Sequence, residues 1–83
     1  MGQNIPNPTK GTAIIEYEIY KEGVVEIRVY NVLGQLIQTL PQGMKKTGHY
    51  QTTISLSNVP AGVYNYMLFI DGEKADGKKM VKQ

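Results

Sequence analysis

Cysteine is missing from this 83-residue sequence, and histidine occurs once. The absence of cysteine excludes a disulfide framework and thiolate-ligated metal sites. The single histidine, His49, has no second histidine or cysteine with which to share a zinc ion, so we expect an exposed strand residue. Ser55 and Ser57 lack the nearby base and acid of a catalytic triad. The sequence therefore predicts no catalytic residue, no metal site and no cofactor.

Long apolar runs and a strongly basic face are absent as well. No apolar run reaches the roughly 18 residues that span a bilayer, and no signal peptide is recognisable. Nine basic and seven acidic residues give a formal net charge of +2, and Arg28 is the only arginine, so we expect no nucleic-acid binding. A chain of this length buries only roughly 60% of its unfolded surface, which leaves little room for a substrate pocket. These features argue against an enzyme.

Apolar residues instead alternate with polar ones, with a period of two residues. Turn residues separate the alternating segments at intervals of about 8–12 residues, and no helical period is present. We expect strands over Thr12–Tyr20, Val24–Tyr30, Gln35–Leu40, His49–Leu56, Val63–Ile70 and Lys78–Lys82. The pattern predicts an all-β, immunoglobulin-like antiparallel β-sandwich of about seven short strands.

Three segments between these strands have the residue chemistry of turns or loops. Asn31 to Gly34 suits a type I turn that ends in a left-handed glycine, so the chain should reverse there. Pro41 to Gly48 contains a proline, two glycines and a lysine pair and is predicted to be an exposed loop. Asp71 to Gly77 is predicted to be a turn. Its carboxylates do not follow the ligand pattern of a calcium-binding loop.

The segment Leu56–Ile70 joins a turn to the longest apolar stretch of the sequence. Tyr64 follows Gly62 at the start of a strand, which matches a tyrosine corner, with the ring in the core and the hydroxyl bonded to upstream backbone. Both parities of the strand are mainly apolar, as in a central strand. Met67 and Phe69 lie on the second face, which we interpret as covered, or as a partner surface if it proves exposed.

Residues 1–11 are interpreted as a lead-in and residues 12–83 as one β-sandwich domain. Two prolines and two asparagines in Gln3–Lys10 forbid a helix and favour an extended or turning path. Met1-Gly2 resembles an initiator added for expression, so we expect this chain to be one domain of a longer protein.

Five stretches of the sequence carry a resemblance that spans the chain. They are Asn7-Pro8 with Ile15-x-Tyr17-x-Ile19, Val29–Ile37, Gly48-His49-Tyr50, Leu56–Tyr66 and Lys78–Val81. Their order and spacing are similar to those of the C-terminal sorting domain of proteins exported by the type IX (Por) secretion system of Bacteroidetes. Two departures are Val59, where the family commonly has leucine, and Ile54, where it often has an aromatic residue.

The resemblance implies a targeting module. Such a domain is recognised in the periplasm by the outer-membrane translocon, and a sortase-like peptidase usually removes it as the upstream cargo reaches the cell surface or medium. Cleavage would fall at or before Asn4. The implied recognition residues are Gly62, Val63, Tyr64, Lys79, Met80, Val81 and Lys82. From the residues alone, Gly62 is explained by its turn and Lys78-Lys79 by a solvated edge strand.

Two other functions stay open at this point. One is an adhesion or carbohydrate-binding β-sandwich appended to a secreted enzyme, which a row of exposed rings from Tyr20, Tyr30 and Tyr50 would favour. The other is a structural spacer that stabilises a neighbouring domain.

Overall fold

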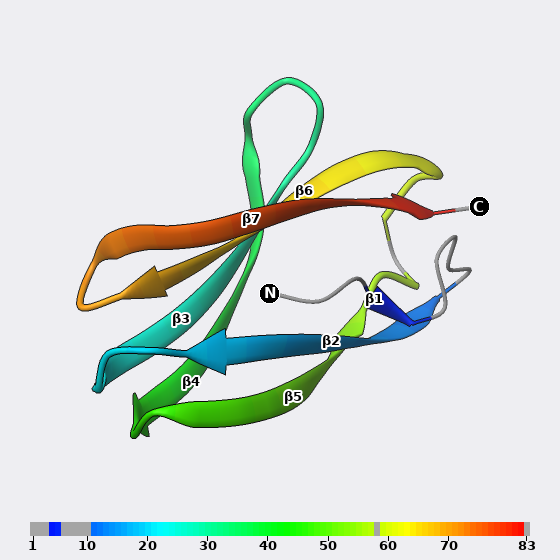
Figure 1. The fold of residues 1–83 in the computed structure, drawn as a ribbon. Helices are drawn as coiled ribbons and strands as arrows, with labels where there is room; N and C mark the ends of the chain where they lie inside the picture. Colours follow the sequence, from blue (N-terminus) through cyan, green and yellow to red (C-terminus); the bar gives the residue numbers. More distant parts are fainter. Residues whose placement is uncertain (1–3, 6–10, 58, 83) are drawn as a thin grey trace.

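A computed structural model describes residues 4–5, 11–57 and 59–82, which form two antiparallel sheets (Figure 1). The strands are β1 (Asn4–Ile5), β2 (Thr12–Ile19), β3 (Gly23–Tyr30), β4 (Leu36–Lys45), β5 (Gly48–Ser55), β6 (Gly62–Ile70) and β7 (Glu73–Lys82). Their order is β1-β2-β5 in one sheet and β4-β3-β6-β7 in the other. The predicted all-β antiparallel sandwich is confirmed. In the described part of the chain there is no helix, and so none that could cross a membrane.

The core lies between the two sheets and is built from one parity of each strand. The buried side chains are Ala13, Ile15, Tyr17, Ile19, Val25, Ile27, Val29, Ile54, Leu56, Tyr64, Tyr66, Leu68, Ile70 and Met80. Directly opposed residues of antiparallel strands share a face, so the pairing of β3 with β6 sets Ile27 beside Leu68. The inward parities predicted for β2, β3 and β6 are the buried ones.

Strand β4 continues through part of the segment predicted to be a loop. Pro41 pairs with Glu26, and Gly43 pairs with Val25, so Gln42 is the extra residue of a β-bulge. Proline is tolerated on an edge strand or at a bulge because no ladder hydrogen bond is lost there, and β4 is an edge strand. The predicted loop over Pro41–Gly48 is therefore wrong, since only residues 46–47 connect β4 to β5.

Strand β7 begins earlier than predicted, because the turn before it has only two residues. Asp71 and Gly72 both have positive φ, 51° and 82°, as a type I′ hairpin turn requires. Glu73 already pairs with Ile70. The predicted turn over Asp71–Gly77 is thus wrong beyond Gly72, and its later carboxylates lie along a strand. Among the described residues, no three His, Cys, Asp or Glu side chains are grouped to hold a metal ion.

The hairpin between β3 and β4 has the predicted geometry. Gly34 has a φ of 81° and its N–H donates to the carbonyl oxygen of Asn31 at 3.0 Å. The loop projects from the sandwich at the top of Figure 1.

The lead-in contributes β1, a short strand that the sequence analysis did not predict. Asn4 pairs with Ile15 and Ile5 with Ile14, at the edge of the three-stranded sheet. The Met1-Gly2 and Asn7-Pro8 segments lie outside the described residues.

Candidate functional site

Strands β6 and β7 bring the two implied recognition segments side by side. Their register pairs Gly62 with Lys82, Val63 with Val81, and Tyr64 with Met80, while Lys79 pairs with Asn65. The seven residues singled out from the sequence therefore form one patch where β6 begins and β7 ends. We call this patch, Gly62–Tyr64 with Lys79–Lys82, the β6–β7 corner.

Tyr64 anchors the β6–β7 corner to the core. Its ring is buried, and its hydroxyl donates a hydrogen bond of 2.5 Å to the carbonyl oxygen of Pro60, four residues upstream. This is the predicted tyrosine corner, which is confirmed. Met80, opposite Tyr64, is also buried. Both side chains face inward, so they shape the corner from below.

Lys82 ties the end of β7 to the turn that precedes β6. Its Nζ donates to the carbonyl oxygen of Val59, and hydrogen bonds from charged donors are stronger than neutral ones. Gly62 has a φ of 155°, a conformation that side chains other than glycine rarely adopt, although nothing lies within 4 Å of the position of a Cβ. Backbone conformation, rather than a close contact, therefore requires glycine at this position.

Three residues of the corner direct their side chains to solvent. Val63 and Val81 are 39% and 41% exposed and lie opposite each other, and Lys79 is exposed one row further along β7. A partner that touches the corner from outside would meet these side chains first.

The second face of β6 is covered by side chains of its own sheet. The Arg28 guanidinium lies over the Phe69 ring, 4.1 Å from its centroid, and its Nη2 is 2.8 Å from Glu26 Oε2. Hydrogen bonds to Tyr30 and Glu26 raise the pKa of Arg28, which keeps this cation charged. Phe69 and Met67 are half-buried. The condition for a partner surface on this face, an open apolar surface, is not met.

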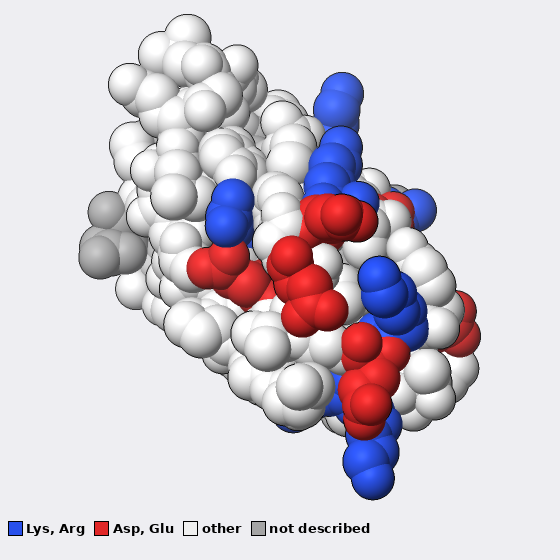
Figure 2. Space-filling model, turned by 90° about the vertical axis from the view of Figure 1, so that its left-hand side faces the viewer, with Lys and Arg blue, Asp and Glu red and all other residues white. Residues whose placement is uncertain are grey.

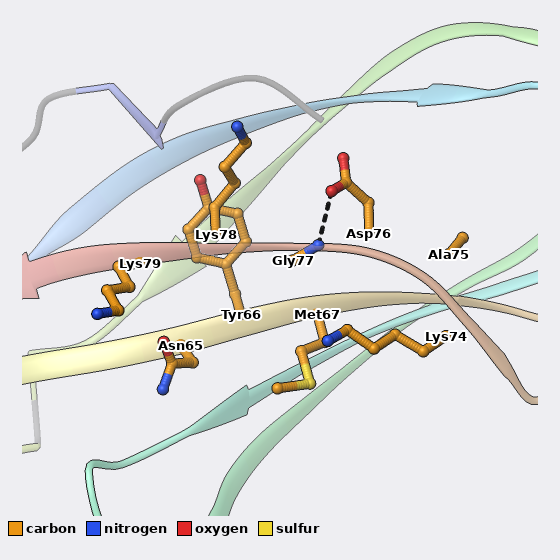
Figure 3. Close-up of a pocket in the computed structure, with 9 residues that line it drawn as sticks. All are labelled: Asn65, Tyr66, Met67, Lys74, Ala75, Asp76, Gly77, Lys78 and Lys79. Carbon is orange, nitrogen blue, oxygen red and sulfur yellow. Dashed lines mark hydrogen bonds between the residues drawn. The ribbon is translucent and has the colours of Figure 1, made fainter.

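A hollow beside the edge of β7 comes from a missing side chain (Figure 3). Gly77 lies opposite Met67, and its N–H is bound by Asp76 Oδ1 at 2.8 Å. Tyr66 and Lys78 point to the other side of the strands. A Cβ on Gly77 would meet Met67 Cγ at 3.6 Å, an ordinary van der Waals distance, so the hollow does not depend on glycine. We assign it no ligand.

The aromatic residues form no binding row. Tyr50 stacks on Tyr17 with ring centroids 5.7 Å apart, and the Tyr17 hydroxyl donates to Gln42 Oε1 at 2.8 Å. Tyr30 belongs to the four-stranded sheet, whereas the exposed Tyr20 follows β2 in the other. The arrangement that would favour carbohydrate binding is not formed.

The sequence analysis missed Val32 and Leu33, which it assigned only to a turn. Both are highly exposed, and they line a hollow together with Gly62, Val63 and Tyr64 of the corner. The available signal was the presence of two aliphatic residues at central turn positions, where polar residues and glycine are usual.

A comparison with protein families identifies the chain. A model described as a secretion system C-terminal sorting domain matches residues 4–83, from β1 through the whole β6–β7 corner. No curated protein and no solved structure matched the chain. Type IX sorting signals mark proteins that are exported through the periplasm to the cell surface or medium. The chain therefore belongs to the family of secretion system C-terminal sorting domains and is a sorting signal of this kind.

Proposed function

We propose that this sorting domain is recognised through the β6–β7 corner by the outer-membrane translocon. Interaction with the type IX machinery and attachment to an upstream cargo follow from the family. The observation that supports the corner as the contact is the pairing of β6 with β7, which makes one surface from two segments distant in sequence.

The residues of the corner divide into two roles in this proposal. Gly62, Tyr64, Met80 and Lys82 hold the turn and the two strands in place through backbone conformation, burial and hydrogen bonds. Val63, Val81 and Lys79 make the direct contacts, because their side chains are exposed.

We further propose that the domain itself has no catalytic activity. The Ser55 and Ser57 hydroxyls lie 3.3 Å from each other, and His49 Nε2 lies 3.1 Å from Glu18 Oε2 on the exposed face of β5 and β2. Neither serine is paired with an imidazole, the arrangement that activates a nucleophile. Residues 12–83 would act as one domain and residues 1–11 as a lead-in to the cargo. A sortase-like peptidase would cut at or before Asn4.

A reporter fusion tests the role of the corner. The chain is fused behind a fluorescent protein with an export signal and produced in a type IX-competent bacterium. We expect the wild-type fusion to reach the surface, and the double variant Val63→Ser, Val81→Ser to remain in the periplasm. Val24→Ser is the matched control, because Val24 is an exposed valine on the same sheet near the other end of β3.

Thermal unfolding of each fusion establishes that the variants are folded. Normal export of the folded double variant would contradict the assignment of the contact to the corner. Periplasmic retention of the wild-type fusion, in cells that export their own cargo, would count against the chain as a sufficient signal.

A further inference from the structure

The β3–β4 loop adds an apolar surface to the β6–β7 corner. Val32 and Leu33 at the tip of the loop are 71% and 79% exposed, although both are large aliphatic residues. A hollow lies between this tip and the start of β6. We call Val32, Leu33, Val63 and Val81 the hairpin–corner surface. Exposed apolar patches on monomeric proteins commonly mark interaction sites, so this surface needs an explanation.

The hollow suits an inserted side chain better than a small molecule. Its volume is about 310 Å³, at the lower limit of the roughly 300–1,000 Å³ of ligand pockets. Its wall consists mainly of aliphatic residues, including Val32, Leu33, Val59 and Val63. Ligand pockets usually add a few convergent polar groups that fix orientation. Asn31 and Tyr64 supply the polar side chains here, and both are engaged in hydrogen bonds of the fold.

The loop holds its two aliphatic side chains in one arrangement. Asn31 Oδ1 accepts hydrogen bonds from the N–H groups of Leu33 and Gln35, each at 3.0 Å, and Asn31 Nδ2 donates to Gln35 Oε1 at 2.8 Å. The backbone N–H of Asn31 also donates to the carbonyl oxygen of Gln35. A preorganised surface loses less conformational entropy on binding, which favours recognition by a partner.

The charges around this surface have one sign. No acidic residue occurs between Glu26 and Asp71, and every carboxylate side chain lies within residues 16–26 or 71–76. These segments include the β2–β3 and β6–β7 turns, at the end of the sandwich that faces the viewer in Figure 2, where red and blue residues are mixed. The projection at the top of that view carries no charged side chain. Next to the hairpin–corner surface, β7 carries Lys79 and Lys82.

We propose that the hairpin–corner surface docks a protein of the secretion machinery that inserts an apolar side chain into the hollow and presents carboxylates to Lys79 and Lys82. This inference rests on the proposed function and identifies the chemistry of the partner. A second copy of the chain fits less well, because it would bring lysines toward lysines. A lipid surface fits less well too, because a hollow is filled by a protruding side chain.

Cysteine cross-linking in cells tests the proposal, because the chain has no cysteine of its own. Leu33→Cys in a cysteine-free reporter fusion is labelled with a thiol-reactive photo-cross-linker during export. Val63→Cys reports on the corner, and Met44→Cys is the control, since Met44 is 66% exposed and pairs with Val24 near the opposite end of the sheet. We expect adducts with an outer-membrane protein of the machinery from Leu33 and Val63, and none from Met44.

A charge variant supplies the second measurement. Leu33→Asp should lower surface delivery of the reporter by about tenfold or more, because it loses apolar burial and places a carboxylate against carboxylates. Leu33→Met and Met44→Asp should be exported normally.

The two proposals fail in distinguishable ways. An adduct from Val63 alone, with normal export of Leu33→Asp, would overturn the role of the hairpin and leave the corner as the contact. The absence of adducts from both positions would overturn both proposals. Leu33 adducts that contain only a second copy of the fusion, or only lipid, would overturn the docking of a machinery protein.

Discussion

Replacing Tyr64 by phenylalanine tests how the β6–β7 corner is held in place. The Tyr64→Phe change keeps a buried ring and removes only the hydroxyl that donates to the Pro60 carbonyl oxygen. The hydrogen bond joins the start of β6 to the turn that precedes it. Its loss should weaken the native state without opening a cavity in the core.

The expected loss of stability is about 1 kcal/mol. A typical intramolecular hydrogen bond contributes about 0.5–1.5 kcal/mol net, and the larger penalties arise when a buried partner is left unsatisfied. Pro60 is exposed, so water can bind its carbonyl oxygen once the hydroxyl is gone. For a domain of this length, a loss of about 1 kcal/mol lowers Tm by about 4–8 °C.

Thermal unfolding followed by circular dichroism measures this difference directly. Tyr20→Phe is the matched control, because Tyr20 is exposed and we expect its variant to unfold at the wild-type Tm. A Tyr64→Phe variant with the Tm of the wild type would refute the view that the tyrosine corner stabilises this fold. An equal fall in both variants would refute it as well, because the effect would not be specific to the bonded hydroxyl.

Three further changes have expected outcomes. Gly23→Ala should lower the free energy of unfolding by about 1–3 kcal/mol in denaturant titration, because its Cβ would lie 2.7 Å from Asp71 Oδ2; unchanged stability would contradict this close packing. Lys82→Met should lower Tm by several degrees, as Nζ no longer binds the Val59 carbonyl oxygen, whereas Lys82→Arg should recover part of the loss. Burial raises the pKa of Tyr17, so the unfolded state loses this proton first as the pH rises, and stability should fall through and above the ordinary tyrosine pKa near 10. Tyr17→Phe should have a shallower alkaline decline in Tm, and an identical decline would rule out this cause.

Local pattern was sufficient for much of the fold. The alternation over β2, β3 and β6 predicted the buried parity correctly, because side chains of a strand point to opposite faces in turn. The tyrosine corner was also predictable, since Tyr64 and Pro60 are close in sequence. The turn at Asn31 to Gly34 depends on residues within the turn itself.

The two errors have a common physical reason. Pro41 and the segment after Gly72 have turn-forming residues, yet both lie in strands because a neighbouring strand binds their backbone. Whether a weak strand former joins a sheet depends on that pairing, which residues distant in sequence supply.

The sequence by itself determined the sandwich class, the inward faces, the tyrosine corner and the family of the chain. Only the tertiary structure decided that Gly62–Tyr64 and Lys79–Lys82 form one corner beside Val32 and Leu33. The reason is the register of β7, in which a bulge at Ala75 shifts the pairing by one residue. Without that extra residue, Lys79 rather than Met80 would lie opposite the buried Tyr64, and a one-residue slip turns every side chain of a strand to the other face.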